Sequence, residues 1–271
     1  MPGMPGTVTD GALPDNMKIR ILGCSGGIGG RHLRTTSILV DRDILIDCGT
    51  GVADLSIAEL AQIDHVFLTH SHIDHIACLP LMVDTVGDLR DRPLTVHALP
   101  ATEEALRRHI FNWTIWPDFT AIPSPAAPCL RFESIALGRP VELQGRRIVP
   151  LPVNHTVPAV GYQLDSGAGS LVFSGDTGPC PEFWAAVNAI DNLRTLLIET
   201  AFSNRERKLA ETSRHLCPSM LGEELQQLRG MPEIFITHLK PGQIELTMAE
   251  IETGSGACKP CMLQNNQVFE L

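Results

Sequence analysis

Residues 69–75 read Thr-His-Ser-His-Ile-Asp-His, and they follow a short apolar stretch, residues 66–69, that is typical of a buried strand. On an extended chain, side chains two positions apart point to the same side, so we expect His70 and His72 to bind one metal ion together. The turn that follows carries Asp74 and His75 toward a neighbouring position. Three imidazoles and a carboxylate this close together need a common partner, and the stretch therefore predicts a metal site.

One such stretch cannot complete two metal sites, so further ligands are expected at the ends of other strands. Three candidates meet this expectation, because each follows an apolar stretch that predicts a strand. They are His155, Asp176 and His238. Taken alone, each is typical of an ordinary polar loop or turn. Taken with residues 69–75, they predict a metal centre at one edge of a sheet.

The order of the expected elements indicates the fold class. Strands near the start are followed by helices, then by a second set of strands between residues 131 and 198, and then by further helices and one strand. This order predicts two packed sheets with helices outside. We expect a flexible tail over residues 1–16 and a single domain over residues 17–271, with an irregular, aromatic insertion around residues 112–128. Residues 52–62 predict one helix.

These motifs resemble those of the metallo-β-lactamase fold superfamily over about residues 17 to 250. The resemblance implies an α/β fold, an αββα four-layer sandwich, with two divalent metal ions. By it, one metal is held by His70, His72 and His155, the second by Asp74, His75 and His238, and Asp176 bridges the two. Zinc is the default ion for such ligands, and iron and manganese suit the same set.

Two positions narrow the reaction that is expected within this superfamily. Flavodiiron redox members have a carboxylate at the position of His72, and β-lactamases commonly have Cys at the position of Asp176. A bridging carboxylate suits two close metals that act on a phosphate. Residues 72–80 also resemble the signature of class II cyclic nucleotide phosphodiesterases, although Ile73 and Cys78 stand where that signature prefers Leu and Gly or Ser. The resemblance implies hydrolysis of a phosphodiester.

Glu199 and His215 are similar to a carboxylate and His pair that occurs in phosphodiesterase branches of the superfamily. These branches include the 3′-tRNA-processing endonucleases. Carried over to this chain, His215 is the general acid that protonates the departing oxygen, and Glu199 orients it. We expect Asp74 to orient the attacking hydroxide. A helix-capping loop with an incidental His is the alternative interpretation of residues 199–219.

Substrate contacts are expected from a glycine-rich loop, residues 23–30, and from the residues that follow it. Arg31, His32 and Arg34 lie in or next to this loop, which is near the metals in the related fold, and Lys240 follows His238 by two positions. Each of these residues is either a substrate contact or a solvated side chain. Three aromatic residues of the insertion either stack on a base or pack in the core or against another subunit; they are Trp113, Trp116 and Phe119.

Composition restricts the partners. The chain has 271 residues, 44% of them hydrophobic, and a formal net charge of −10, which disfavours long nucleic acids and anionic membranes. No apolar run approaches the roughly 18 residues of a membrane span. Residues 1–16 lack the features of a secretory signal, so we expect a cytoplasmic protein whose 8 cysteines are reduced. Cys258 and Cys261 form a lone C-x-x-C pair with a structural or a redox role.

The sequence therefore predicts a binuclear metal-dependent hydrolase of a small phosphodiester. The first candidate substrate is a 3′,5′-cyclic nucleotide, cyclic AMP or cyclic GMP, cleaved to the 5′-nucleotide. Three alternatives stay open: an RNA-processing phosphodiesterase, a lactonase or thioesterase that uses the same metals, and a noncatalytic metal or redox sensor that uses Cys258 and Cys261. Related enzymes often pair near such an insertion, which implies a homodimer.

Overall fold

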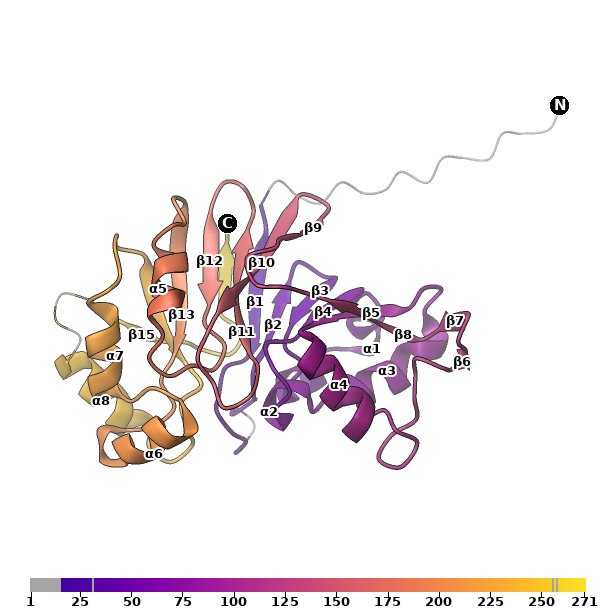
Figure 1. Cartoon of the computed structure of the whole chain (residues 1–271), viewed down its shortest axis with the longest axis horizontal. Helices are drawn as coiled ribbons and strands as arrows, with labels where there is room; N and C mark the ends of the chain where they lie inside the picture. Colours follow the sequence, from indigo (N-terminus) through magenta and orange to yellow (C-terminus); the bar gives the residue numbers. More distant parts are fainter. Residues whose placement is uncertain (1–15, 31, 255, 257) are drawn as a thin grey trace.

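A computed structural model describes residues 16–30, 32–254, 256 and 258–271, and the tail predicted over residues 1–16 lies outside these ranges except for Asn16. Two large sheets face each other, and helices cover the outer side of each (Figure 1). This arrangement is the αββα sandwich that the order of elements predicted. In the described part of the chain, no helix is long and apolar enough to cross a bilayer.

The first sheet has 7 strands in the order β16-β1-β2-β3-β4-β5-β8. β16, β1, β2 and β3 pair in antiparallel fashion, whereas β3, β4, β5 and β8 are parallel. Its strands are β1 (Lys18–Gly23), β2 (Ser37–Val40), β3 (Ile44–Ile46), β4 (His65–Phe67), β5 (Leu94–Ala98), β8 (Leu130–Ser134) and β16 (Val268–Glu270).

The second sheet repeats this plan with 7 strands in the order β15-β14-β13-β12-β11-β10-β9. β9 to β12 pair in antiparallel fashion, and β12 to β15 are parallel. Its strands are β9 (Val141–Leu143), β10 (Arg146–Pro152), β11 (Val160–Asp165), β12 (Ser170–Phe173), β13 (Leu193–Glu199), β14 (Glu233–Thr237) and β15 (Cys261–Met262).

Helices flank both sheets, and the apolar side chains form three layers of core. The first set of helices packs on the first sheet, the second set packs on the second sheet, and a third core lies between the sheets. The first set is η1 (Thr50–Asp54), α1 (Ile57–Leu60), α2 (Ile73–Ile76), α3 (Leu79–Val86), η2 (Gly87–Leu89) and α4 (Pro100–His109). The second set is α5 (Pro181–Val187), η3 (Asn204–Glu206), α6 (Arg207–Ser213), α7 (Pro218–Leu225) and α8 (Ile244–Gly254).

The pleat of strand β4 places successive side chains in different layers of the core. Val66 belongs to the core under the helices, and Phe67, the next residue, belongs to the core between the sheets. Successive side chains of a strand point to opposite faces, so both faces of β4 are apolar and the strand is buried on both sides. The chain leaves β4 at its carboxyl end and enters the motif at residues 69–75.

The predicted helix over residues 52–62 is wrong. Thr50–Asp54 is a short 3₁₀-helix, and Leu55 is extended. A separate helix, α1, begins after Ser56, whose hydroxyl accepts a hydrogen bond from the Glu59 backbone while the Glu59 side chain accepts one from the Ser56 backbone. This reciprocal capping box starts a new helix and breaks the one expected. The insertion at residues 112–128 also contains a two-stranded ribbon, β6 (Pro123–Ser124) and β7 (Ala127–Pro128).

Candidate metal centre and active site

The first group of ligand-type side chains comes from both sheets. His70 and His72 follow β4, His155 follows β10 and Asp176 follows β12, and one ligand atom from each lies within 4.8 Å of the others. The Nε2 atom of His155 is 3.1 Å from Nδ1 of His72. The Nε2 atom of His70 is 3.7 Å from the Oδ2 atom of Asp176.

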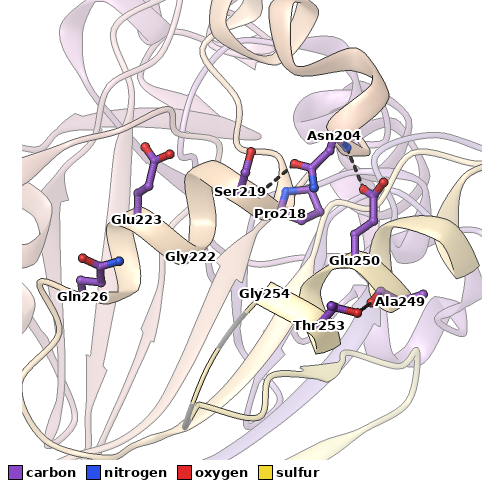
Figure 2. A pocket seen from close by; sticks show the side chains of 10 residues that line it. All are labelled: Asn204, Pro218, Ser219, Gly222, Glu223, Gln226, Ala249, Glu250, Thr253 and Gly254. Atoms are coloured by element: carbon purple, nitrogen blue, oxygen red, sulfur yellow. Dashed lines mark hydrogen bonds between the residues drawn. The ribbon is translucent and has the colours of Figure 1, made fainter.

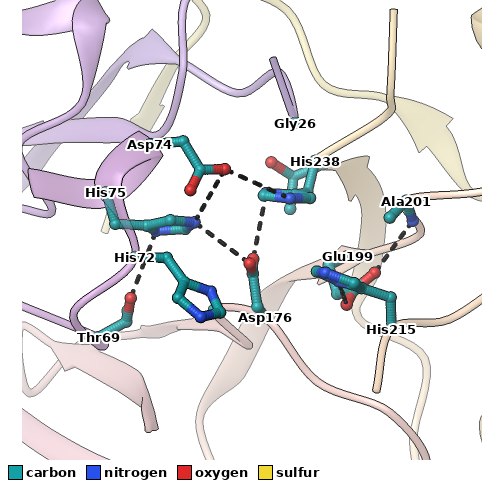
Figure 3. Close-up of polar contacts among 12 residues, drawn as sticks. Gly26, Thr69, His72, Asp74, His75, Asp176, Glu199, Ala201, His215 and His238 are labelled. Atoms are coloured by element: carbon teal, nitrogen blue, oxygen red, sulfur yellow. Dashed lines mark hydrogen bonds and ion pairs between the residues drawn. The ribbon is translucent and has the colours of Figure 1, made fainter. Parts of the chain in front are cut away.

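The second group adjoins the first and consists of Asp74, His75 and His238, whose ligand atoms also lie within 4.8 Å of one another. Oδ2 of Asp74 is 3.8 Å from Nε2 of both histidines. Oδ2 of Asp176 is 3.3 Å from Nε2 of His75, so the Asp176 carboxylate stands between the two groups (Figure 3). The structure thus brings together all seven side chains that the resemblance assigned to the metals.

The buried polar atoms of this centre test whether metal ions fit it. Among the described residues, several buried ligand atoms here have no hydrogen-bond partner: His70 Nε2, His75 Nε2, Asp176 Oδ1, His238 Nδ1 and His238 Nε2. A buried polar atom without a partner costs about 1–3 kcal/mol, so such a concentration requires a common ligand. Imidazole nitrogens and carboxylate oxygens suit zinc, iron and manganese. The residues present therefore fit a pair of divalent cations.

The charge states of these side chains agree with that fit. Burial lowers the pKa of His155 to about 4 and that of His238 to about 3, and it holds the pKa of His70 well below the usual value. Burial acts to raise the pKa of Asp176, but the facing His238 and His75 outweigh it and lower that pKa. At His70, His155 and His238 the centre therefore offers neutral imidazoles, and at Asp176 an ionised carboxylate, the forms that bind metals. Burial also acts to lower the pKa of His75, but Asp176 and Asp47 outweigh it and raise that pKa, so this imidazole has to lose its proton when a metal binds.

Asp47 is a buried neighbour of the centre that the sequence did not reveal. His75 donates a hydrogen bond from Nδ1 to Oδ2 of Asp47 over 2.7 Å, which leaves Nε2 to face Asp176. Thr69 holds Asp47 in turn through its backbone N–H at 2.8 Å and its hydroxyl. A carboxylate of this kind fixes the tautomer and orientation of a metal-binding His. Its signal in the sequence is only a polar residue after the apolar strand β3.

Arg214 holds His155 in a similar way through two hydrogen bonds, each of which is accepted by a main-chain carbonyl. Nδ1 of His155 donates to the Arg214 carbonyl over 3.1 Å, and the Arg214 guanidinium donates to the His155 carbonyl over 2.6 Å. Nε2 of His155 is therefore free to face His72. Arg214 ends α6 with a left-handed backbone, φ 54°, which a non-glycine residue adopts uncommonly. The contact uses a carbonyl, which has no side-chain signature in the sequence.

The predicted pair of Glu199 and His215 lies beside the two groups. Nδ1 of His215 donates to Oε1 of Glu199 over 2.7 Å, and the buried carboxylate also accepts hydrogen bonds from the backbone N–H groups of Thr177, Ala201 and Leu216. His215 reaches the centre itself, because it has a ligand atom within 4.8 Å of one from Asp176 and one from His238. The incidental-His interpretation does not explain this network.

Burial acts to lower the pKa of His215, but the charge of Glu199 and its hydrogen bond outweigh burial and raise that pKa above the usual value. The imidazole therefore keeps a proton to higher pH than a free histidine. Since Nδ1 is occupied by Glu199, the proton available to a substrate is the one on Nε2.

The candidates for substrate contact differ in their surroundings. Lys240 lies beside the centre and donates to the carbonyl of Gly26 in the glycine-rich loop over 2.7 Å. Arg34 instead makes a two-pronged ion pair with Asp54, at 2.8 and 2.9 Å. His32 is exposed and makes no hydrogen bond or ion pair with the centre in the described part of the chain. Arg31 lies outside the described residues.

The glycine-rich loop closes over the second group. Gly26 packs so tightly against His238 that an added Cβ atom would lie 2.4 Å from the His238 carbonyl oxygen and 2.8 Å from its ring (Figure 3). The backbone of Gly26 donates to the carbonyl of Leu239 over 3.1 Å. Only glycine allows this approach.

The three aromatic residues singled out in the insertion have separate environments. Phe119 is buried in the core under the first set of helices, and Trp116 packs against the same core. Trp113 is 65% exposed. Packing therefore explains the first two, and Trp113 alone keeps the option of a stacking contact.

A groove of about 590 Å³ lies between α7 and α8, apart from the metal centre (Figure 2). Asn204 spans it, because its backbone N–H donates to Glu250 over 2.8 Å and its side chain accepts from the Ser219 backbone over 2.8 Å. None of the residues that line the groove belongs to the metal centre. Its polar groups bind one another and give no indication of a ligand.

Known proteins with similar sequences include hydrolases. A "probable 3′,5′-cyclic-nucleotide phosphodiesterase" of Yersinia pestis is 27% identical over 227 residues, which cover 72% of this chain and 64% of that protein. A ribonuclease Z of Halorubrum lacusprofundi is 27% identical over 157 residues, 55% of this chain and 48% of that protein. The match thus spans less than two thirds of either relative.

A solved structure gives the same fold. The crystal structure of unliganded yeast PDE1 matches with a TM-score of 0.76 at 19% identity, and the match covers 94% of this chain and 99% of that one. The family model described as a beta-lactamase superfamily domain matches residues 42–253. The chain therefore belongs to the beta-lactamase superfamily and has the metallo-β-lactamase fold that residues 69–75 predicted.

Proposed function

We propose that the protein is a metal-dependent phosphodiesterase that hydrolyses a small phosphodiester, with a 3′,5′-cyclic nucleotide as the first candidate. The observation that carries this proposal is the position of the Glu199 and His215 pair next to two groups of ligands that share Asp176. A proton donor beside a carboxylate-bridged centre is the combination that breaking a P–O ester bond needs. The names of two relatives support the same reaction type.

One metal ion is assigned to His70, His72 and His155, the second to Asp74, His75 and His238, and Asp176 is assigned to both. Bound there, two divalent cations would lower the pKa of a shared water to about 7 and neutralise charge on the phosphoryl oxygens. Zinc is the first choice, and iron or manganese suits the same donors.

The side chains have separate tasks in this proposal. Asp74, which is the most exposed of the assigned carboxylates, orients the attacking water. His215 delivers the proton on Nε2 to the departing oxygen, and Glu199 holds the ring through Nδ1 and keeps it protonated. The oxygen of the attacking water, which has lost a proton, forms a bond to phosphorus as the P–O ester bond breaks, and the leaving oxygen takes the His215 proton and becomes a hydroxyl group.

A small substrate is favoured over RNA by charge. The chain has a formal net charge of −10, which opposes the approach of a polyanion. An RNA-processing phosphodiesterase is the second candidate, since the ribonuclease Z relative points to it. A lactonase or thioesterase would not need His215, and a noncatalytic sensor would not need the pair at all. The expectations of a cytoplasmic location and of a homodimer stay predictions.

The test is a parallel screen of the protein loaded with zinc, manganese or iron. The substrates are bis-p-nitrophenyl phosphate, cyclic AMP, cyclic GMP, RNA and a set of lactones and thioesters. We expect turnover of the phosphodiesters, the cyclic nucleotides above RNA, and about two metal ions per chain by elemental analysis. Turnover of lactones or thioesters without phosphodiesters, or less than one ion per chain, rejects the proposal.

A further inference from the structure

Lys240 is held in a fixed position beside the candidate active site. Its backbone N–H donates to the carbonyl of Ala201 over 3.1 Å, and its ammonium group donates to the carbonyl of Gly26 over 2.7 Å. These two contacts attach it to the end of β13 and to the glycine-rich loop. The side chain is half-buried, so its position is defined rather than averaged over many rotamers.

The ammonium of Lys240 acts on the centre electrostatically. Burial is the largest influence that lowers the pKa of His238, and Lys240 adds to it. The same ammonium opposes the rise in the pKa of His215 that Glu199 causes. The contacts place Lys240 at the same position, because Ala201, which anchors its backbone, donates to Glu199, the partner of His215, and Gly26, which anchors its ammonium group, packs against His238.

No carboxylate lies within ion-pair distance of Lys240 among the described residues. An ammonium group has three N–H donors, and Gly26 takes one of them. Two donors and a full positive charge therefore remain for a ligand. An anion is the ligand that matches such a group, because it accepts hydrogen bonds from the free N–H donors and neutralises the charge.

Two other cations of the described chain are Arg34, a candidate for substrate contact, and Arg214, which contacts a ligand of the centre. Arg34 is neutralised by Asp54 at 2.8 and 2.9 Å. Arg214 donates to the carbonyl of His155 over 2.6 Å and serves that ligand. Arg214 also has no carboxylate partner among the described residues, but it is exposed to solvent, whereas Lys240 is half-buried.

We propose that Lys240 is a specificity-determining residue that binds the anionic oxygen of the substrate phosphodiester on the side of His215. The inference rests on the proposed function, because it names the group that reads the charge of the substrate. It predicts that the site prefers an anionic phosphodiester to a neutral ester of similar size.

The test compares Lys240→Met, Lys240→Arg and a control, Lys208→Met, with the wild type. Lys208 is an exposed lysine on α6. The substrates are bis-p-nitrophenyl phosphate, which is anionic, and p-nitrophenyl acetate, which is neutral. A charge-assisted contact of this kind contributes on the order of 10- to 100-fold, so we expect Lys240→Met to lower kcat/KM for the phosphodiester by about that factor, chiefly through KM. The neutral ester changes less than about twofold, Lys240→Arg recovers part of the loss, and Lys208→Met matches the wild type.

A second measurement does not depend on turnover. Calorimetric titration of the zinc-loaded proteins with inorganic phosphate is expected to show about 10-fold or greater weakening in Lys240→Met, at unchanged metal content. Equal losses on both substrates, loss of metal in the variant, or phosphate binding equal to that of the wild type overturns the inference. If the wild type cleaves no phosphodiester but Lys240→Met binds phosphate more weakly, the proposed function fails and the Lys240 contact stands.

Discussion

Strand β4 begins at His65 and leads into residues 69–75 past its other end, and a close pair of histidines is found in each of these two regions. At its start, Nδ1 of His65 lies 3.0 Å from Nε2 of His97 on the adjacent strand. Just past its other end begins the metal centre, where Nδ1 of His72 lies 3.1 Å from Nε2 of His155. The two pairs have almost the same separation between the same two kinds of nitrogen atom.

The surroundings of the two histidine pairs are different. The ring of His97 stacks on Phe67 with centroids 4.2 Å apart, and its nitrogens have partners in His65 and the exposed Glu133. Burial lowers the pKa of His97 to about 3, so this pair is neutral as well. Paired, neutral and buried histidines are therefore not sufficient for a metal site. What distinguishes the centre is its set of buried ligand atoms, Oδ1 of Asp176 among them, that have no hydrogen-bond partner among the described residues and face only one another.

The largest expected effect comes from removing the shared carboxylate. Asp176→Ala is expected to lose metal and to reduce kcat on the order of 10³-fold or more, because both groups of ligands depend on it. The matched control is His65→Leu, which breaks the other histidine pair and is expected to keep both metal ions and full activity. Elemental analysis and steady-state kinetics make the comparison, and metal loss in both variants would remove the distinction between the two pairs.

Removing the proton donor is expected to have the second largest effect on kcat. His215→Asn is expected to lower kcat by about 10²- to 10⁴-fold with metal content unchanged, which is the usual contribution of a general acid. A neutral ester with a good leaving group serves as the internal control, since it needs no proton and is expected to lose much less. A variant that hydrolyses the phosphodiester at a near-normal rate would exclude His215 from this role.

Removing the charge of Asp47, which holds His75, is expected to have a smaller effect. Asp47→Asn is expected to weaken metal binding by about 10- to 100-fold, because the amide no longer fixes the imidazole by a charged hydrogen bond. Competition with a chromogenic chelator measures the affinity. His97 faces a carboxylate as well, the exposed Glu133 at 3.7 Å, and Glu133→Gln is the control that should leave metal affinity unchanged. An Asp47→Asn protein with wild-type affinity would contradict the assignment.

The histidine pair at the start of β4 is expected to affect stability alone. His65→Leu leaves Nε2 of the buried His97 without a partner and should lower the free energy of unfolding by about 1–3 kcal/mol. Urea denaturation monitored by Trp fluorescence gives this value. Unchanged stability would show that the hydrogen bond between the two rings contributes nothing.

The smallest expected effect is in the pH dependence. A general acid works while it is protonated, and Glu199 raises the pKa of His215 above its usual value. Activity is therefore expected to persist above pH 6.5 and to decline only as the pH rises through this raised pKa. The alkaline decline should be absent from the residual activity of His215→Asn. If it persists there unchanged, another group titrates.

The sequence predicted which ligand-type side chains lie close together because each of them follows the end of a strand. Parallel strands have their carboxyl ends at one edge of a sheet, so polar residues after β12 and β14 lie close to each other whatever the connections between them. The rule brings Asp176 close to His238 in the second sheet, whereas residues 69–75 follow β4 of the first sheet and meet them because the two sheets pack face to face. Asp47 obeys the same rule after β3, but a single aspartate after a strand is too common to be recognised.

Other features depended on contacts that no local pattern encodes. The pairing of Arg34 with Asp54 joins residues 20 positions apart, and the bond of Arg214 to His155 joins residues 59 positions apart. The break in the predicted helix at 52–62 is different, since Ser56 and Glu59 form a recognisable capping signal. That error came from giving apolar periodicity more weight than the cap.

The tight packing of Gly26 against His238 limits how this family member can change. A mutation that adds any side chain at position 26 displaces a candidate ligand, so natural variation in substrate preference has to arise elsewhere. Ile28 and Ile73, 70% and 65% exposed, have no such restriction. Libraries for altered selectivity should randomise those two positions and hold 26 constant.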